Sequence, residues 1–280
     1  MNDQARVLRL ARREHLRLVT GGGDADRPAL VIGSGKGGVG KSMLASMVSV
    51  ALAKSGRRVL LVDGSQNLGN LHVLLGVRPE LTPQALLEED TLPDELVINI
   101  AEKLWLLPAD SGAETVQRLG ATDRARLHRR MTAVYHNFDA VVVDAAAGLD
   151  GAVRCVAMHA TRLMVVTAPE PAALTDAYAL MKVVHGQVAQ LPFDVLVNRV
   201  QHEDEGITAF DRLATAATRF LGRDLNYIGA VPEDPSMRTL ARDPKALLDA
   251  DGTSPAQCAV RDIVSACEQS WTATMQESHG

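Results

Sequence analysis

A glycine-rich stretch near the start of the chain, GSGKGGVGKS at 33–42, constrains the fold more than any other feature. The apolar run ALVIG leads into it, and the helical pattern MLASMVSVALAKSG follows it. Glycines allow positive φ and let successive backbone N–H groups converge on one anion. The stretch fits the G-x-x-x-x-G-K-[ST] pattern of phosphate-binding loops at Gly35, Gly40, Lys41 and Ser42. It therefore predicts a strand, a phosphate loop and a helix in direct succession, with Lys41 on the β and γ phosphates and Ser42 on Mg²⁺.

Apolar strand patterns and helical patterns alternate along the rest of the chain. The further strand patterns are RVLLVD, LWLLPA, FDAVVVDAA, LMVVTAPEP, FDVLVNRV and LNYIGAVPED. Strands that are apolar throughout are typical of a parallel sheet covered on both faces. The alternation predicts an α/β fold with one doubly wound, mostly parallel sheet of about seven strands and helices on both faces. We expect a long loop at 64–81 and a short helix at 82–90, opened by Thr82 and Pro83.

Composition and charge set the domain organisation. The 280 residues are 46% hydrophobic, which is enough for one large core, and the net charge of −5 argues against direct nucleic-acid binding. Residues 1–19 are locally basic with a helical pattern, and TGGGDADRP reads as a linker. We therefore expect an N-terminal partner-binding helix at 1–19, a flexible linker at 20–28 and a single P-loop domain at 29–280. The three cysteines show no metal-ligand spacing, and no apolar run is long enough to span a bilayer, which predicts a cytoplasmic protein.

Two lysines flank the glycine cluster, although one phosphate loop needs only one. The order KGGVGKS resembles the deviant Walker A motif of the MinD/ParA family of ATPases. That resemblance implies that Lys36 crosses a dimer interface to the partner's nucleotide, so that ATP, but not ADP, drives formation of a homodimer. It also implies an adenine contact from Asn198 in VNR and a place beside the base for Pro232 in GAVPED. The nucleotide-binding set is then Gly35, Lys36, Gly37, Gly38, Val39, Gly40, Lys41, Ser42, Asn198, Arg199 and Pro232.

A second motif supplies the expected magnesium ligands. VVVDAAAG at 141–148 resembles the Walker B strand and the switch that follows it in this family. The resemblance implies that Asp144 holds the Mg²⁺ hydration shell and that Gly148 lies near the γ-phosphate. The expected metal set is Ser42, Asp63 and Asp144, and the expected catalytic set is Lys36, Lys41, Asp63 and Asp144.

The sequence departs from the family pattern after the second strand. That strand normally ends D-x-D, but here VDGSQ places Ser65 two residues after Asp63. A serine cannot act as a carboxylate base, and loss of a positioned acid–base group typically costs about 10²–10⁴ in rate. We therefore expect ATP and Mg²⁺ to bind and hydrolysis to be slow or absent. Asp150 is the open alternative, as a substitute carboxylate.

Three stretches point to one branch of the family, the FlhG/FleN regulators of flagellar number. PEPAALTDAYALMK and NLGNLHVLLG resemble that branch, and DQARVLR at 3–9 matches its DQAxxLR motif. The resemblance implies a helix that docks on the signal-recognition-type GTPase FlhF, with Gln4 as the residue that stimulates its hydrolysis. It also implies contact with a transcription regulator of flagellar genes. The partner-binding residues are Asp3, Gln4, Ala5, Leu8 and Arg9; the alternative for this segment is a solvated extension.

Other interpretations of the whole chain stay open. One is a hydrolysing MinD/ParA-type ATPase that drives partition or cell-division positioning. Another is a scaffold that no longer binds nucleotide, which the intact phosphate loop disfavours. The pattern AVRDIVSACEQSW near the carboxyl end carries one apolar stripe, which favours packed core over an interfacial membrane helix. Attachment at the inner membrane or the cell pole is left open.

Overall fold

The computed structural model describes residues 29–65, 69–81, 83–88, 90–109, 122–123, 126, 130, 133–146, 148–149, 152–153, 160–249 and 253–277. The DQARVLR segment at 3–9, the linker at 20–28 and Asp150 lie outside these ranges.

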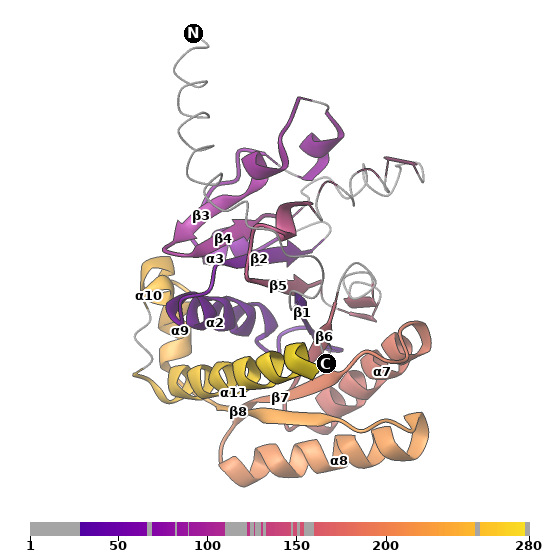
Figure 1. Cartoon of the computed structure of the whole chain (residues 1–280). Coiled ribbons are helices and arrows are strands. Elements are labelled where there is room, and N and C mark those ends of the chain that lie inside the picture. Colours follow the sequence, from indigo (N-terminus) through magenta and orange to yellow (C-terminus); the bar gives the residue numbers. More distant parts are fainter. Residues whose placement is uncertain are drawn as a thin grey trace.

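Within the described residues, eight strands form one sheet in the order β3-β4-β2-β5-β1-β6-β7-β8 (Figure 1). All neighbouring pairs are parallel except β3 and β4. The strands are β1 (Ala29–Gly33), β2 (Val59–Gly64), β3 (Ile98–Ala101), β4 (Leu104–Leu107), β5 (Ala140–Ala145), β6 (Arg162–Thr167), β7 (Phe193–Val200) and β8 (Asn226–Pro232). The predicted mostly parallel α/β sheet is confirmed.

Helices cover both faces of this sheet. The helices of the described residues are α2 (Lys41–Lys54), α3 (Leu71–Leu74), α7 (Pro171–Gln187), α8 (Glu203–Leu221), α9 (Ser236–Leu240), α10 (Pro244–Leu248) and α11 (Pro255–Glu277), with 3₁₀ turns at Pro83–Leu87 (η1) and Pro93–Leu96 (η2). In Figure 1, α2 and α11 lie side by side on one face, and α7 and α8 lie on the other. Among the described helices, none is both long and apolar enough to cross a membrane.

The alternation of side chains along β1 shows why its sequence is apolar throughout. Ala29 and Val31 pack into the core that includes α7, whereas Leu30 and Ile32 pack into the core that includes α2 and α11. Successive strand residues point to opposite faces, and both faces are buried here. The apolar stripe of α11 also belongs to the core: Val260, Ile263, Val264 and Cys267 are all buried.

The structure corrects the sequence predictions at the edges of the fold. The edge strand β3 was not predicted, because INIA is short and only partly buried, and it pairs with β4 as a hairpin. The predicted loop at 64–81 contains α3, whose Leu71 is buried, with Leu75 just beyond it. The predicted helix at 82–90 is a 3₁₀ turn at Pro83–Leu87, and Thr82 lies outside the described residues.

Candidate functional site

The predicted phosphate loop connects the end of β1 to the start of α2. Gly40 is the residue before α2 and has φ 92°, and Gly38 has φ 82°. L-residues with side chains rarely adopt this left-handed region, so both positions favour glycine. The loop therefore turns its backbone at the amino end of a 14-residue helix, where unpaired N–H groups and the helix dipole attract anions.

Two neighbouring elements hold the loop in place. At its start, a side chain on Gly35 would place Cβ 1.9 Å from the backbone oxygen of Asp176 in α7, so only glycine fits. Near its end, Asn198 Nδ2 from β7 donates a hydrogen bond of 2.7 Å to the carbonyl oxygen of Val39. Val39 is itself part of the loop. Its side chain is buried in the core, so only its backbone faces the other residues of the loop.

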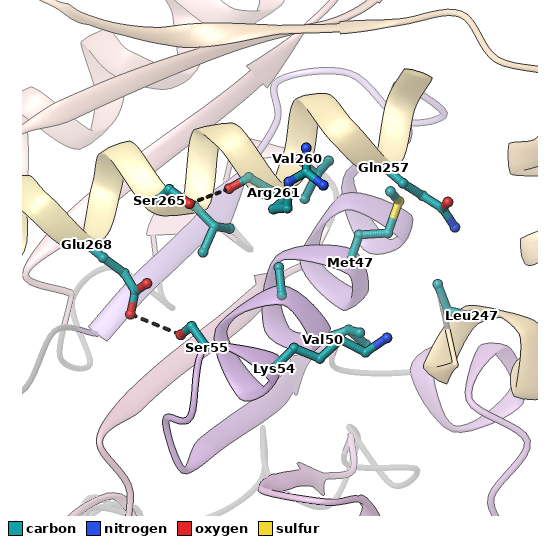
Figure 2. Close-up of a pocket in the computed structure, with 12 residues that line it drawn as sticks. Met47, Val50, Lys54, Ser55, Leu247, Gln257, Val260, Arg261, Ser265 and Glu268 are labelled. Carbon is teal, nitrogen blue, oxygen red and sulfur yellow. Dashed lines mark hydrogen bonds between the residues drawn. The ribbon is translucent and has the colours of Figure 1, made fainter. Parts of the chain in front are cut away.

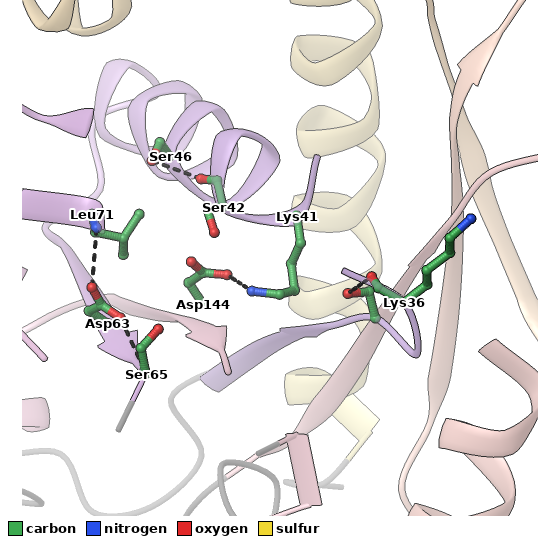
Figure 3. Close-up of polar contacts among 9 residues, drawn as sticks. Lys36, Lys41, Ser42, Ser46, Asp63, Ser65, Leu71 and Asp144 are labelled. Carbon is green, nitrogen blue, oxygen red and sulfur yellow. Dashed lines mark hydrogen bonds and ion pairs between the residues drawn. The ribbon is translucent and has the colours of Figure 1, made fainter. Parts of the chain in front are cut away.

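Lys41, Ser42 and Asp144 meet directly beside the loop (Figure 3). Lys41 is the first residue of α2, and its Nζ pairs with Oδ1 of Asp144 at the end of β5. Ser42, the next residue of α2, lies close enough to influence the pKa of the Asp144 carboxyl. Burial raises the pKa of Asp144 above its ordinary value and the charge of Asp63 adds to the shift, although Lys41 and Ser42 oppose it.

Asp63 lies on the strand next to Asp144, in the same register. β2 and β5 pair so that the two aspartates are direct neighbours near the ends of their strands. Asp63 Oδ1 accepts a hydrogen bond from the Ser65 N–H at 3.0 Å, and Oδ2 accepts one from the Leu71 N–H at 3.2 Å. A Cβ on Gly69 would lie 2.6 Å from Asp63 Oδ2. Asp63 therefore organises the chain between β2 and α3 as well as contributing charge.

Lys36 differs from Lys41 in its surroundings. Its side chain is exposed, and Figure 3 shows it directed away from Lys41 and Asp144. Its backbone carbonyl accepts a hydrogen bond of 3.0 Å from the Ser34 hydroxyl, which fixes the backbone from which the side chain projects. The structure thus places one lysine of this loop in a buried ion pair with Asp144 and leaves the other exposed at the surface.

The remaining predicted nucleotide residues lie at the ends of β7 and β8. The β7–β8 pairing shifts register between Asn198 and Val200, and Arg199 between them has φ 62°. This bulge leaves Asn198 buried and Arg199 exposed. Pro232 pairs with Val200 at the same edge of the sheet. Gly148, which follows β5, has φ 88°, a backbone conformation that favours glycine.

A separate groove of about 290 Å³ lies between α2 and α11 (Figure 2). Its walls are mostly apolar and include Met47, Val50 and Val260, with Arg261 and Glu268 at its border. The groove runs along the second half of α2, whereas the phosphate loop lies at the opposite, amino end of that helix. None of the residues predicted for the nucleotide site lines this groove.

Comparison with known protein families identifies the family of this chain. The model described as the CobQ/CobB/MinD/ParA nucleotide binding domain matches residues 30–245. The chain belongs to the MinD/ParA nucleotide-binding family. This family membership confirms the resemblance seen in the glycine-rich stretch and accounts for the strand–loop–helix unit at the start of the domain.

Individual members of the MinD/ParA family match most of the chain. The antiactivator FleN of Pseudomonas aeruginosa is 32% identical, with 84% of each chain covered. The flagellum site-determining protein YlxH of Helicobacter pylori is 29% identical, covering 78% of this chain and 74% of YlxH. The septum site-determining protein MinD of Pyrococcus horikoshii, solved with Mg-ADP, shares the fold at a TM-score of 0.67 and 23% identity, covering 86% and 95% of the two chains.

Two features of this MinD/ParA site were missed by sequence reasoning. The hydrogen bond from Asn198 to Val39 joins residues 159 positions apart, and no local pattern reports such a contact. The hydrogen bond from the N–H of Leu71, the first residue of α3, to Asp63 was also missed. The spacing of Leu68, Leu71 and Leu75 was the available signal for a helical turn after β2.

Proposed function

We propose that the chain is an ATP-dependent dimerisation switch that regulates the number or placement of flagella. The observation that carries the proposal is the pair of lysines on one loop, with Lys41 buried beside Asp144 and Lys36 exposed. A buried lysine offsets phosphate charge within one subunit, and an exposed one is available to a second subunit. The similarity to FleN and YlxH supports the flagellar role.

The residues at the loop fit a magnesium nucleotide. Asp144 and Asp63 are buried carboxylates on adjacent strand ends, and Ser42 adds a hydroxyl, which is the hard oxygen donor set that Mg²⁺ prefers. We propose that Ser42, Asp63 and Asp144 hold the ion, directly or through water, and that it neutralises phosphate charge when bound. Lys41 then exchanges its bond to Asp144 for the β and γ phosphates.

The expected binding site for the adenine base lies where β7 and β8 end. Asn198, Arg199 and Pro232 are neighbours there through the β7–β8 pairing, and Asn198 also reaches the phosphate loop. Parallel α/β sheets bind ligands at the carboxyl ends of their strands, and both groups of residues lie at that edge. This placement supports one continuous nucleotide site from Pro232 to Asp63.

The proposed partners follow from the family branch. FleN is an antiactivator by name, which supports an interaction of this chain with a transcription regulator of flagellar genes. The segment at 3–9 supports docking on an FlhF-type GTPase through Asp3, Gln4, Ala5, Leu8 and Arg9. Because nucleotide state would control the dimer, both contacts become subject to the switch.

Light scattering coupled to size exclusion tests the switch. We expect the wild-type chain to be monomeric without nucleotide and with MgADP, and dimeric with MgATP. Lys36→Ala should stay monomeric in MgATP while its ATP affinity falls by less than about threefold, because the exposed lysine acts on the partner's phosphates. Lys245→Ala, which removes an exposed lysine from α10, is the matched control and should dimerise normally.

The same experiment has a clear contrary result. If wild-type protein that is saturated with MgATP elutes with the mass of the nucleotide-free protein, the switch is wrong. If Lys36→Ala dimerises as well as Lys245→Ala, the dimer forms without a lysine from the partner, and the assigned role of Lys36 is wrong.

A further inference from the structure

The contact between Asn198 and Val39 suggests a second role for this asparagine. We propose that Asn198 is a positioning residue, which holds the phosphate loop in its anion-binding conformation before any ligand arrives. This inference rests on the proposed nucleotide function of the loop. It differs from the base contact expected from the sequence, because it concerns the other end of the nucleotide.

The loop needs an external restraint because of its own composition. Four of the six residues from Gly35 to Gly40 are glycines, and glycine loses more backbone entropy on ordering than any other residue. Inside the loop, the hydrogen bond from the Ser34 hydroxyl to the Lys36 carbonyl orders only the first half. The second half, which leads directly into Lys41, is where Asn198 acts.

The hydrogen bond fixes one particular peptide unit. The Val39 carbonyl can only accept, so the amide nitrogen of Asn198 must face it. The carbonyl of Val39 and the N–H of Gly40 belong to the same planar trans peptide and point in opposite directions. Holding the carbonyl toward Asn198 therefore aims the Gly40 N–H away from β7 and keeps it available to an anion. Without the bond, a flip of this peptide costs little, because Gly40 accepts either sign of φ.

Close packing makes the restraint specific. A Cβ on Gly40 would lie 2.5 Å from Asn198 Nδ2, so the amide rests directly against the backbone of the loop. Asn198 is only 8% exposed, and water competes poorly for its hydrogen bond. Its backbone is anchored by pairing with Val231, and the bulge at Arg199 turns the next side chain outward. The asparagine is thus a rigid support on a strand rather than a mobile group.

Two variants separate positioning from base recognition. Asn198→Ala removes the amide, and Asn198→Asp keeps its size but replaces the donor with an oxygen that repels the Val39 carbonyl. Asn226→Ala is the control: Asn226 also donates from its amide, at 2.9 Å to Asp194 Oδ1, but it begins β8 at the opposite end of the strand from Pro232. Thermal unfolding of all three identifies any variant with a general loss of stability.

The first measurement is hydrogen exchange of the loop amides at 36–42 in protein without ligand. We expect faster exchange in Asn198→Ala and Asn198→Asp than in wild type, and no change in Asn226→Ala. The second is affinity for magnesium tripolyphosphate, which has phosphates but no base, measured by competition with a fluorescent ATP analogue. Both Asn198 variants should bind it about three- to tenfold more weakly, the effect of losing one buried hydrogen bond.

The outcomes distinguish this inference from the proposed function. Unchanged loop exchange, with weaker binding confined to ligands that carry adenosine, would overturn the positioning role and leave only a base contact. If the wild-type chain binds neither ATP nor tripolyphosphate, the proposed nucleotide function fails. The exchange comparison still decides the positioning role in that case, because it uses no ligand.

Discussion

At the scale of single residues, the site places two buried carboxylates beside one buried lysine. Asp144 and Asp63 are adjacent on neighbouring strands, and both are buried. Two buried carboxylates so close repel each other unless a cation compensates them. The Lys41 ammonium supplies one positive charge through Asp144, while backbone N–H groups satisfy both oxygens of Asp63. In the proposed nucleotide complex, a phosphate that draws Lys41 away would leave these carboxylates uncompensated, and we therefore expect phosphate to bind together with a cation such as Mg²⁺.

Ser65 leads to a prediction about hydrolysis. The Ser65 N–H donates a hydrogen bond to Asp63 Oδ1, and the sequence resemblance leads us to expect a carboxylate at this position in relatives. We expect wild-type turnover of MgATP to be very slow and Ser65→Asp to raise it by about 10²-fold, the lower end of the effect of a positioned acid–base group. Phosphate release at saturating MgATP measures this.

The matched control for Ser65→Asp is Ser65→Asn, which has nearly the same shape but no acid. Equal MgATP turnover by the two variants would show that the carboxylate does not cause the increase in rate. Fast turnover in the wild type would instead favour the hydrolysing partition or positioning ATPase, with Asp150 or another group as the base.

The sequence could predict some of these residues and not others. Lys41, Ser42 and Asp144 were predictable because each follows a local rule: a loop spacing or the end of an apolar strand. The role of Asn198 at Val39 was not, because the contact depends on how β7 and β1 are placed in the sheet. The spacing of a motif predicts which of its own residues contact a ligand. It does not predict which residues elsewhere in the fold keep the motif in its conformation.

At the scale of elements, the central strands were predictable and the edges were not. β1, β5 and β6 are buried on both faces, so their sequences carry continuous apolar runs. β3 is buried on one side at most, and its register is interrupted by an irregularity beside Ala101. The short helices α9 and α10 are five residues each, too short for a helical period to be visible in sequence.

Asp234 links three elements and gives a pH-dependent prediction. Its carboxylate accepts from the N–H of Ser236 at 2.9 Å and of Ala256 at 3.1 Å, which joins the end of β8 to α9 and α11. Burial acts to raise the pKa of Asp234, but hydrogen bonds from Ser254, Ala256 and Ser236 outweigh it and lower the pKa from 3.8 to about 2. Folding thus favours the ionised form, so the stabilisation is complete above pH 3.8 and is lost as the pH falls through 2.

We expect Asp234→Ala to lower the Tm by about 2–4 °C at pH 7, the usual effect of losing a helix cap in a chain of this size. The difference from wild type should shrink as the pH falls from about 4 to about 2, because the carboxylate of the unfolded chain is protonated first and that of the folded chain only near its pKa of about 2. Thermal unfolding between pH 7 and pH 2 measures both. Asp211→Ala, at an exposed position on α8, should show neither effect. A difference that stays constant with pH would contradict the role of the ionised carboxylate.

At the scale of the whole molecule, the described fold begins with an inner strand of the sheet. β1 lies between β5 and β6, and the N–H and the carbonyl of its first residue, Ala29, are both hydrogen-bonded. The Ala29 N–H donates to the Thr161 hydroxyl at 3.1 Å, and the Ala29 carbonyl accepts from the Thr161 N–H at 3.0 Å. The residue that precedes β6 therefore holds the start of β1 in place.

These bonds at Ala29 lead to a prediction about truncation. A chain that begins at Ala29 should keep the Tm of the full chain within about 2 °C and should still bind MgATP and dimerise, because every contact described for the site lies after that residue. It should lose stimulation of an FlhF-type GTPase, because the proposed docking residues at 3–9 are removed.

Gln4→Ala in the full chain should reduce that stimulation about tenfold or more and leave dimerisation intact, since one side-chain amide orients the attacking water. The GTP turnover of the FlhF-type GTPase, measured with and without each variant, tests the stimulation. Light scattering of each variant in MgATP tests dimerisation. A truncated chain that no longer dimerises would place the first segment in the switch itself, and full stimulation by Gln4→Ala would remove the proposed role of that segment.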